Sequence, residues 1–353
     1  MNPANQPSGD AGQSRQTTTL VTGANGEFGH GLIEALHAEG HRDIVAIDLR
    51  ECDPKVRELC RETHVGDVVD NNLVDRLLAS YEITTIFHLA ALLSTRAEFN
   101  PEAAHQVNVE GTLNLLRLAA AQSASHGHTV KFLFPSSIAA YGIPDLEAKR
   151  AAGDVDESQF LEPTTMYGCN KLACEHLGRY YMSHYRQLAK DRKPGGVDFR
   201  CIRFPGVISA FTEPTGGTSD FAPEMIHSAA KGQPYASFVR EDTRIPFITM
   251  PDAVTALRRL EAVERGSLTR CVYNIGGFSP SAGDVAEIVR REFPGAEISW
   301  AVDEARQGIV DSWPETVDDR AAVSDWGWKP AHDLETAFAD YLLPNIRRKY
   351  GLV

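Results

Sequence analysis

Positively charged side chains are in the minority in this sequence. Its 353 residues include 35 lysines and arginines against 48 aspartates and glutamates, which gives a formal net charge of -13. A protein that binds nucleic acid needs clustered positive charge to meet the phosphate backbone, and the chain has no such stripe. The composition therefore argues against a nucleic-acid-binding function.

Cysteine pairs of the kind that hold zinc or build a disulfide framework are also missing. The six cysteines contain no C-x-x-C spacing, and the twelve histidines are scattered. Even His126-Gly127-His128 has no further ligand pattern beside it. We therefore expect no metal site, and we expect reduced thiols in a cytoplasmic protein.

Long apolar runs are absent as well. No stretch is long enough to span a membrane. The first sixteen residues are rich in Asn, Gln, Ser and Gly and lack the apolar core of a signal peptide. Residues 1–16 are predicted to be a disordered tail, and no membrane association is expected.

What the chain does contain is a glycine-rich turn after its first predicted strand. Residues 17–22 favour a β-strand, and Gly23, Gly26 and Gly29 then lead into an amphipathic helical pattern. Glycines allow a tight turn and a close approach of the backbone, and the start of a helix attracts phosphate. Strand, glycine turn and helix together predict a dinucleotide-binding site.

The second predicted strand, residues 43–47, ends at Asp48, nineteen residues after Gly29. A carboxylate at this position can accept hydrogen bonds from the ribose hydroxyls of adenosine. Its charge would repel the extra phosphate of NADP, so NAD is the predicted cofactor. Arg50 is the reason for caution, since it could pair with that phosphate. The alternative is an acidic strand end beside an ordinary turn.

Further predicted strands at 65–68, 85–90 and 130–134 alternate with helical patterns. This alternation predicts an α/β fold with a Rossmann-type doubly wound parallel sheet. The long segments 145–163 and 187–196 are charged and polar, and we expect loops there.

Two units are predicted. An NAD-binding domain spans 17–208 and reclaims the later segments 245–262 and 272–276. A smaller C-terminal α/β substrate-binding lobe takes 209–244 and 277–353.

Tyr167 and Lys171 stand four residues apart in a helix-compatible run, which places them on one helix face. A phenol is a poor base at neutral pH, but a fixed ammonium nearby favours its ionised form. Tyr167 would then be a usable general acid or base. The alternative is a surface tyrosine beside a solvated lysine.

The motifs Gly23-x-x-Gly26-x-x-Gly29, Ser137, Tyr167-x-x-x-Lys171 and 203–207 resemble, in this order, the extended short-chain dehydrogenase/reductase superfamily. The resemblance covers nearly the whole chain. More specific stretches look like the NAD-dependent L-threonine 3-dehydrogenases of that superfamily: 204–210, 216–222, 242–246, 306–314 and 325–329.

This resemblance implies roles for particular residues. Tyr167 would remove the proton of the substrate's β-hydroxyl, Ser137 would hydrogen-bond that oxygen, and Lys171 would favour the ionised tyrosine and hold the nicotinamide ribose. The implied reaction is oxidation of L-threonine to 2-amino-3-oxobutanoate with hydride transfer to NAD. Besides Tyr167 and Lys171, the positions that match the cofactor side are Gly23, Gly26, Glu27, Phe28, Gly29, Asp48, Asp67, Val68, Leu89, Ala91 and Pro205. Besides Ser137 and Tyr167, those that match the substrate side are Ser94, Thr218, Ser219, Asp220 and Trp313.

The substrate side also has a physical interpretation. Ser219 or Asp220 can cap a helix after the Gly216-Gly217 turn, and free amides at its start would attract a carboxylate. Asp220 could accept the substrate's ammonium. Simple helix capping is the alternative there. Trp313 could equally be a core aromatic residue.

Three other functions stay open. One is a nucleotide-sugar 4-epimerase or dehydratase of the same superfamily, another a dehydrogenase of a different β-hydroxy acid, and the third a catalytically idle NAD-sensing protein. A homodimer is expected, because the predicted helix 103–121 is apolar on two faces and the helix after Tyr167 is also more apolar than one sheet face requires.

Overall fold

A seven-stranded parallel sheet forms the centre of the protein. The computed structural model describes residues 17–191, 196–214 and 216–352, so the predicted tail lies outside the described residues. In spatial order the strands are β11 (Val272–Asn274), β7 (Val197–Phe204), β5 (Val130–Ser137), β4 (Glu82–His88), β1 (Thr17–Thr22), β2 (Ile44–Asp48) and β3 (Glu62–Val65). The strand order reverses between β1 and β4, and ligands bind at such switch points, outside the carboxyl ends of the strands.

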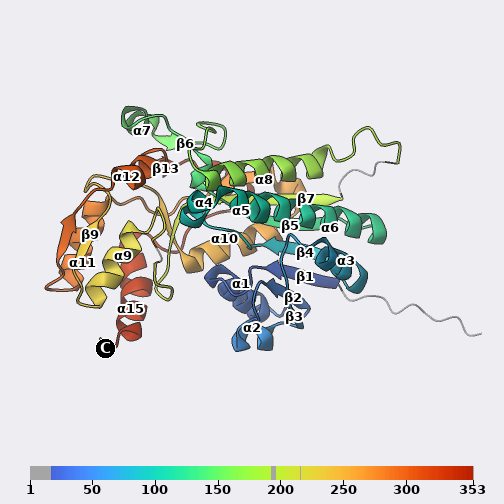
Figure 1. The fold of residues 1–353 in the computed structure, drawn as a ribbon, viewed down its shortest axis with the longest axis horizontal. Coiled ribbons are helices and arrows are strands. Elements are labelled where there is room, and N and C mark those ends of the chain that lie inside the picture. The colour runs from blue at the N-terminus through green and yellow to red at the C-terminus, as the bar shows by residue number, and fades with distance from the viewer. Residues whose placement is uncertain (1–16, 192–195, 215, 353) are drawn as a thin grey trace, which may run out of the picture.

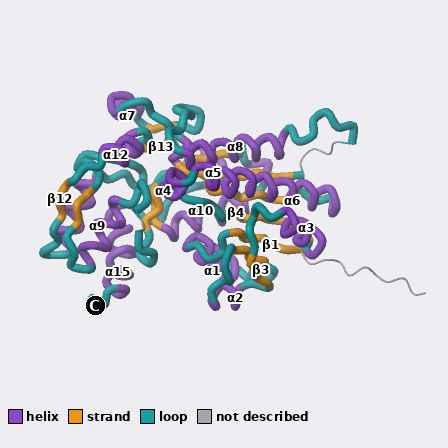
Figure 2. Tube along the Cα trace, in the orientation of Figure 1, coloured by secondary structure: helices purple, strands orange, loops and turns teal. Residues whose placement is uncertain are grey.

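Helices cover both faces of this sheet (Figures 1 and 2). One face carries α3 (Asn71–Ser80), α5 (Pro101–His105), the π-helical η1 (Gln106–Glu110), α6 (Gly111–His126) and α8 (Met166–Ser183). The other carries α1 (Glu27–Ala38), α2 (Pro54–Leu59), α10 (Met250–Ala262) and α13 (Arg320–Trp326). The predicted Rossmann-type α/β fold is confirmed.

Side chains that alternate between the two faces of the sheet contribute to two separate apolar cores. In β5, Phe132 and Phe134 belong to the core under α6 and α8, whereas Leu133 belongs to the core under α1 and α10. Successive side chains of a strand point to opposite faces, so a strand covered on both sides is apolar throughout. This explains the consecutive apolar residues at 44–47 in β2 and at 132–134 in β5.

A smaller lobe with its own core lies at the left of Figure 1. Its elements are α9 (Phe221–Ala230), β9 (Tyr235–Ser237), α11 (Ala282–Glu292), β12 (Ile298–Trp300), α12 (Glu304–Asp311), α14 (Leu334–Thr336), η4 (Ala337–Leu342) and α15 (Leu343–Lys349). Strand β8 (Gly206–Ile208) pairs with β10 (Phe247–Thr249) where the chain passes between the two parts. Strand β11 belongs to the central sheet and α10 packs on it, which supports the prediction that 245–262 and 272–276 belong to the NAD-binding domain. The division into two units stays a prediction.

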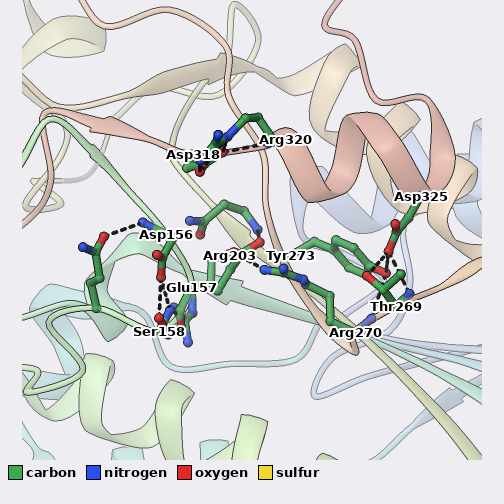
Figure 3. A network of polar contacts seen from close by, with 12 residues as sticks. Asp156, Glu157, Ser158, Arg203, Thr269, Arg270, Tyr273, Asp318, Arg320 and Asp325 are labelled. Atoms are coloured by element: carbon green, nitrogen blue, oxygen red, sulfur yellow. Dashed lines mark hydrogen bonds and ion pairs between the residues drawn. The ribbon is translucent and has the colours of Figure 1, made fainter.

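The prediction for segment 145–163 was wrong. It contains α7 (Leu146–Ala152) and β6 (Asp154–Val155), and β6 pairs with β13 (Thr316–Val317). Glu157 fastens it to the sheet: its carboxylate accepts the Asn274 amide at 3.0 Å and pairs with Arg270, and its carbonyl accepts Arg203 (Figure 3). These partners lie far away in the sequence, so the local polar composition concealed the ordered structure.

Other boundaries also differ from expectation; β4, for example, covers Glu82–His88 where 85–90 was predicted. The predicted strand 65–68 is displaced, because β3 ends at Val65 and residues 66–68 lie in the connection to α3. The predicted helix 103–121 is longer: α5, η1 and α6 form a continuous helical stretch from Pro101 to His126. Among the described residues no helix is both long and apolar enough to cross a membrane.

Candidate active site

The glycine turn between β1 and α1 has no room for side chains. Gly23 has a φ of +71°, and a β-carbon there would lie 2.7 Å from the Ala90 nitrogen. A β-carbon on Gly29 would lie 2.5 Å from the Gly23 carbonyl oxygen. No side chain caps the start of α1 at Gly26. The turn therefore has the tight backbone and uncapped helix start that suit a pyrophosphate.

Asp48 is held over this turn at the end of β2. Its carboxylate accepts the Asn25 amide at 2.9 Å and the Arg50 amide at 3.3 Å. The two bonds orient a negative charge beside the glycine turn, where adenosine ribose hydroxyls would be recognised.

The other cofactor candidates follow the same edge of the sheet. Asp67 and Val68 come after β3, Leu89 and Ala91 after β4, and Pro205 after β7. Parallel strands end on one side, so the fold gathers these positions along a single edge.

Two candidates in the glycine turn already have partners for their side chains. The Glu27 carboxylate accepts the Ser209 hydroxyl, and the Phe28 ring packs edge to face with Phe204 at 5.2 Å between centroids. Both contacts fasten α1 to the chain leaving β7. Any contact of Glu27 or Phe28 with a cofactor therefore falls mainly to the backbone.

Ser137 and Tyr167 are carried by neighbouring elements. Ser137 is the last residue of β5, and its hydroxyl accepts the Ala139 amide at 3.1 Å. Tyr167 is the second residue of α8, whose start is capped by the Thr165 hydroxyl accepting the Gly168 amide at 3.0 Å. The short helix η2 (Ile138–Ala140) after Ser137 packs directly against α8.

Lys171 lies one helical turn after Tyr167 and is buried. Its ammonium donates to the Pro135 carbonyl at 2.6 Å and lies 5.4 Å from the centre of the Tyr167 ring. The cation is thus fixed between the end of β5 and the phenol. This arrangement agrees with the helix-face prediction, and the catalytic roles of the three residues stay a proposal.

A buried ion pair behind these residues was missed by the sequence analysis. Glu175, one turn beyond Lys171, pairs with Arg203 of β7 at 2.7 Å and accepts the Ser136 hydroxyl at 2.6 Å. Ser136 and Pro135 thus join the end of β5 to α8 through two side chains of one helix face. A Tyr-x-x-x-Lys-x-x-x-Glu spacing was the available signal.

Asn108 was missed too. Its side-chain amide accepts the Leu92 amide hydrogen at 2.8 Å and donates to the Leu92 carbonyl at 3.0 Å. The π-helical turn η1 places Asn108 for this contact. It fixes the loop that carries Leu89, Ala91 and, at the first position of α4 (Ser94–Phe99), Ser94.

The substrate-side candidates come from three segments. The Thr95 hydroxyl donates to the Gly216 carbonyl at 2.9 Å, which brings α4 beside the turn before Thr218. The Thr218 hydroxyl and the Trp313 indole nitrogen are buried without a hydrogen-bond partner among the described residues. Buried polar groups are normally paired, so these two atoms mark places where a ligand could bind.

The predicted cap of α9 was wrong. The helix begins at Phe221 after Asp220, with no side-chain capping bond. The Asp220 carboxylate instead accepts the Gly217 amide at 2.6 Å, closing its own turn, and Ser219 lies within that turn. The first amides of α9 therefore receive no side-chain cap from this residue.

A doubly wound sheet with a glycine turn at the first strand, and with Ser, Tyr and Lys at the carboxyl edge, defines an NAD-dependent oxidoreductase of the extended short-chain type. The model of the NAD dependent epimerase/dehydratase family matches residues 19–276, and the chain belongs to that family. NAD, predicted from the glycine turn and Asp48, is thereby confirmed as the cofactor.

Three relatives narrow the similarity. The mitochondrial L-threonine 3-dehydrogenase of Bos taurus is 33% identical over 94% of this chain and 83% of its own length. The L-threonine dehydrogenase structure from Clostridium difficile is 33% identical with a TM-score of 0.81, covering 96% of this chain and 99% of that one. The GalE-like enzyme from Cupriavidus necator in its holo form is 33% identical with a TM-score of 0.80, covering 92% and 99%.

Proposed function

We propose that this protein oxidises the β-hydroxyl of L-threonine to 2-amino-3-oxobutanoate. The observation that carries the proposal is a pair of buried donors without a partner among the described residues. The Thr218 hydroxyl follows the turn that contacts α4, and the Trp313 indole lies in the core against which Tyr167 packs. Relatives named for this activity, at 33% identity over nearly the whole chain, support it.

Each of the three catalytic residues would have a different role in removing the proton of the β-hydroxyl. Tyr167 takes the proton of the β-hydroxyl, and Ser137 hydrogen-bonds the same oxygen as its charge develops. Lys171, held by Pro135, stabilises the ionised phenol electrostatically. When bound, NAD accepts the hydride from the substrate's β-carbon.

The start of α9 suits a carboxylate. The Thr218 hydroxyl has no partner among the described residues, and no side chain caps the first turn of the helix. Helix amides attract anions. Arg306 of α12 donates to the Gly217 carbonyl at 2.8 Å and keeps the turn in place. Asp220 stays the proposed acceptor for the substrate's ammonium.

The first experiment measures NADH formation with NAD and a panel of amino acids and other β-hydroxy acids. L-threonine should give the highest kcat/KM. Thr218→Ala should raise the KM for L-threonine about ten- to a hundredfold, because a hydrogen bond to a charged group is lost. The KM for NAD should not change. Ser299→Ala, an exposed serine of the same lobe, is the matched control.

The family name also covers epimerases and dehydratases, so a nucleotide-sugar enzyme is the second candidate. Such a reaction need not release NADH and has to be followed by product analysis. Conversion of a UDP-hexose together with no NADH from L-threonine would overturn the threonine proposal and leave the fold and family assignments unaffected.

A further inference from the structure

The end of α12 has an unusual arrangement just before Trp313. The carbonyl of Val310 accepts two hydrogen bonds, one from the Trp313 backbone amide at 3.2 Å and one from the ammonium of Lys149 at 2.9 Å. Lys149 belongs to α7, in the segment between Ser137 and Tyr167. The side chain of Lys149 and the backbone amide of Trp313 therefore donate to the same carbonyl oxygen, that of Val310.

Lys149 is 2% exposed, which is rare for a lysine. Burial lowers the pKa of Lys149 to about 8, although the charges of Asp311 and Glu315 favour the ammonium, and Arg240 and Asp242 lie among the other charges around it. Burying an ammonium is costly unless it is paired or hydrogen-bonded. Packing alone would be served better by an apolar residue, so the contact with Val310 is the feature that needs an explanation.

The same segment holds the neighbouring residue Ser312 at two more points. The Ile143 amide donates to the Ser312 carbonyl at 2.8 Å, and the hydroxyls of Thr164 and Ser312 lie 3.0 Å apart. Ile143 follows Ser137 by six residues and Thr164 precedes Tyr167 by three. Both ends of the connection between the catalytic residues thus contact the chain immediately before Trp313.

Trp313 is buried in the core that also contains Ile138, and Tyr167 packs against that core. The other end of α12 reaches the Thr218 turn, because Arg306 donates to the Gly217 carbonyl. Helix α12 therefore connects Thr218 and Trp313, the two donors of the proposed substrate site that have no partner in the described part of the chain. Lys149 contacts the last turn of this helix.

We infer that Lys149 is a positioning residue that fixes Trp313 through the Val310 carbonyl and thereby sets the affinity for the amino-acid substrate. This inference rests on the proposed function for the identity of the substrate. It gives segment 145–163 a role in substrate recognition, although none of its own residues needs to touch the substrate.

The test compares Lys149→Met with Arg150→Met. Methionine keeps the apolar stem of Lys149 and removes its donor. Arg150, the next residue in α7, makes an exposed ion pair with Asp242 at 2.7 Å and is the matched control. Lys149→Met should raise the KM for L-threonine about tenfold, with kcat and the KM for NAD changed less than about twofold. Arg150→Met should leave all three constants unchanged.

A second measurement does not depend on turnover. Hydrogen exchange of the backbone amides at 309–313 should become about tenfold faster in Lys149→Met than in wild type or Arg150→Met, because the last turn of α12 loses its anchor. A purely structural role would instead lower the melting temperature without a selective change in the KM for L-threonine.

Unchanged exchange at 309–313, or an unchanged KM for L-threonine in an enzyme that oxidises it, would overturn the inference. If the wild type does not oxidise L-threonine, the proposed function fails, and the exchange measurement alone decides whether Lys149 anchors α12. If Lys149→Met does not fold, both measurements pass to Lys149→Leu, which also lacks the donor to the Val310 carbonyl. Faster exchange with a raised KM supports the inference there, and unchanged values overturn it.

Discussion

Gly168 of α8 lies directly against the carbonyl group of Ala139. A β-carbon on residue 168 would come within 2.0 Å of that oxygen, far inside van der Waals contact. Gly168 follows Tyr167 by one residue and Ala139 follows Ser137 by two, so this contact sets how closely the tyrosine helix approaches the serine turn. Only a residue without a side chain permits the approach.

Gly168→Ala should therefore have a large effect on kcat and only a small effect on the melting temperature. A methyl group would push α8 away from η2 and separate Tyr167 from Ser137, and small displacements of catalytic groups are costly. We expect a fall in kcat of about a hundredfold or more, measured as NADH formation beside a thermal melt. Gly266→Ala is the control, because a β-carbon there meets nothing within 4 Å. Full activity in Gly168→Ala would show that the approach is not required.

The parts of the site that the sequence predicts are the local ones. The glycine turn and the Tyr167 to Lys171 spacing each depend on residues that are close together in the sequence, so their patterns are sufficient to predict them. The contact of Gly168 with Ala139 and the pairing of Glu175 with Arg203 join separate elements, and no local pattern encodes them.

Errors in the predicted elements have two origins, one long-range and one local. Segment 145–163 was expected to be a loop because it is polar, yet Glu157 and β13 order it through residues more than a hundred positions away. The strand predicted at 65–68 was displaced, since Asp67 accepts the Val69 amide at 3.1 Å and forms a turn instead.

Tyr167→Phe removes one hydroxyl and should abolish proton transfer. We expect kcat to fall by about 10² to 10⁴, the usual contribution of general acid–base catalysis, with NAD affinity and the melting temperature nearly unchanged. NADH formation and NAD titration measure the two effects. Tyr185→Phe is the control, because it also removes one phenol hydroxyl and Tyr185 lies beyond the end of α8. A Tyr167→Phe enzyme with most of its turnover would exclude this residue as the base.

Asp48 should make the enzyme prefer NAD strongly over NADP. Asp48→Asn keeps an acceptor for the Asn25 backbone amide while removing the negative charge. The glycine turn should therefore keep its structure, and the preference for NAD over NADP should become smaller. The ratio of kcat/KM for the two cofactors measures this change. Equal efficiency with both cofactors in the wild type would contradict the role of Asp48 and point to Arg50 as a phosphate partner.

His88 should make the protein sensitive to acid. It is buried between the hydroxyls of Thr22 and Thr112, at 2.8 and 3.0 Å, and burial lowers its pKa to about 3. Between about pH 6.5, the ordinary value, and pH 3 the unfolded chain binds a proton that the folded protein does not. The contribution of neutral His88 to the free energy of unfolding is fully present above pH 6.5. It is lost as the pH falls, by up to ~1.4 kcal/mol per pH unit.

The measurement is the free energy of unfolding as a function of pH. Glutamine at position 88 does not titrate, so the free energy of unfolding of His88→Gln should fall less steeply between pH 6 and 4 than that of the wild type. His41→Gln, at an exposed position just after α1, is the control. Parallel curves for His88→Gln and the wild type would contradict this account.

The last prediction concerns the homodimer. Much of the apolar surface of the predicted interface helices is used within the chain, since Leu115, Leu118 and Tyr181 are buried there. On the remaining surface Tyr180 of α8 is 41% exposed, and Phe99 at the end of α4 is 86% exposed. Helices α6 and α8 pack side by side, so two copies could pair these helices as a four-helix bundle about a twofold axis.

Sedimentation at micromolar concentration should therefore show a dimer. Tyr180→Asp would place like charges opposite each other across a twofold interface and should shift the equilibrium to monomer. Leu188→Asp is the control, because Leu188 is 96% exposed and lies beyond the end of α8. A wild type that sediments as a stable monomer would contradict the prediction and would leave Phe99 and Tyr180 exposed to solvent without a partner surface.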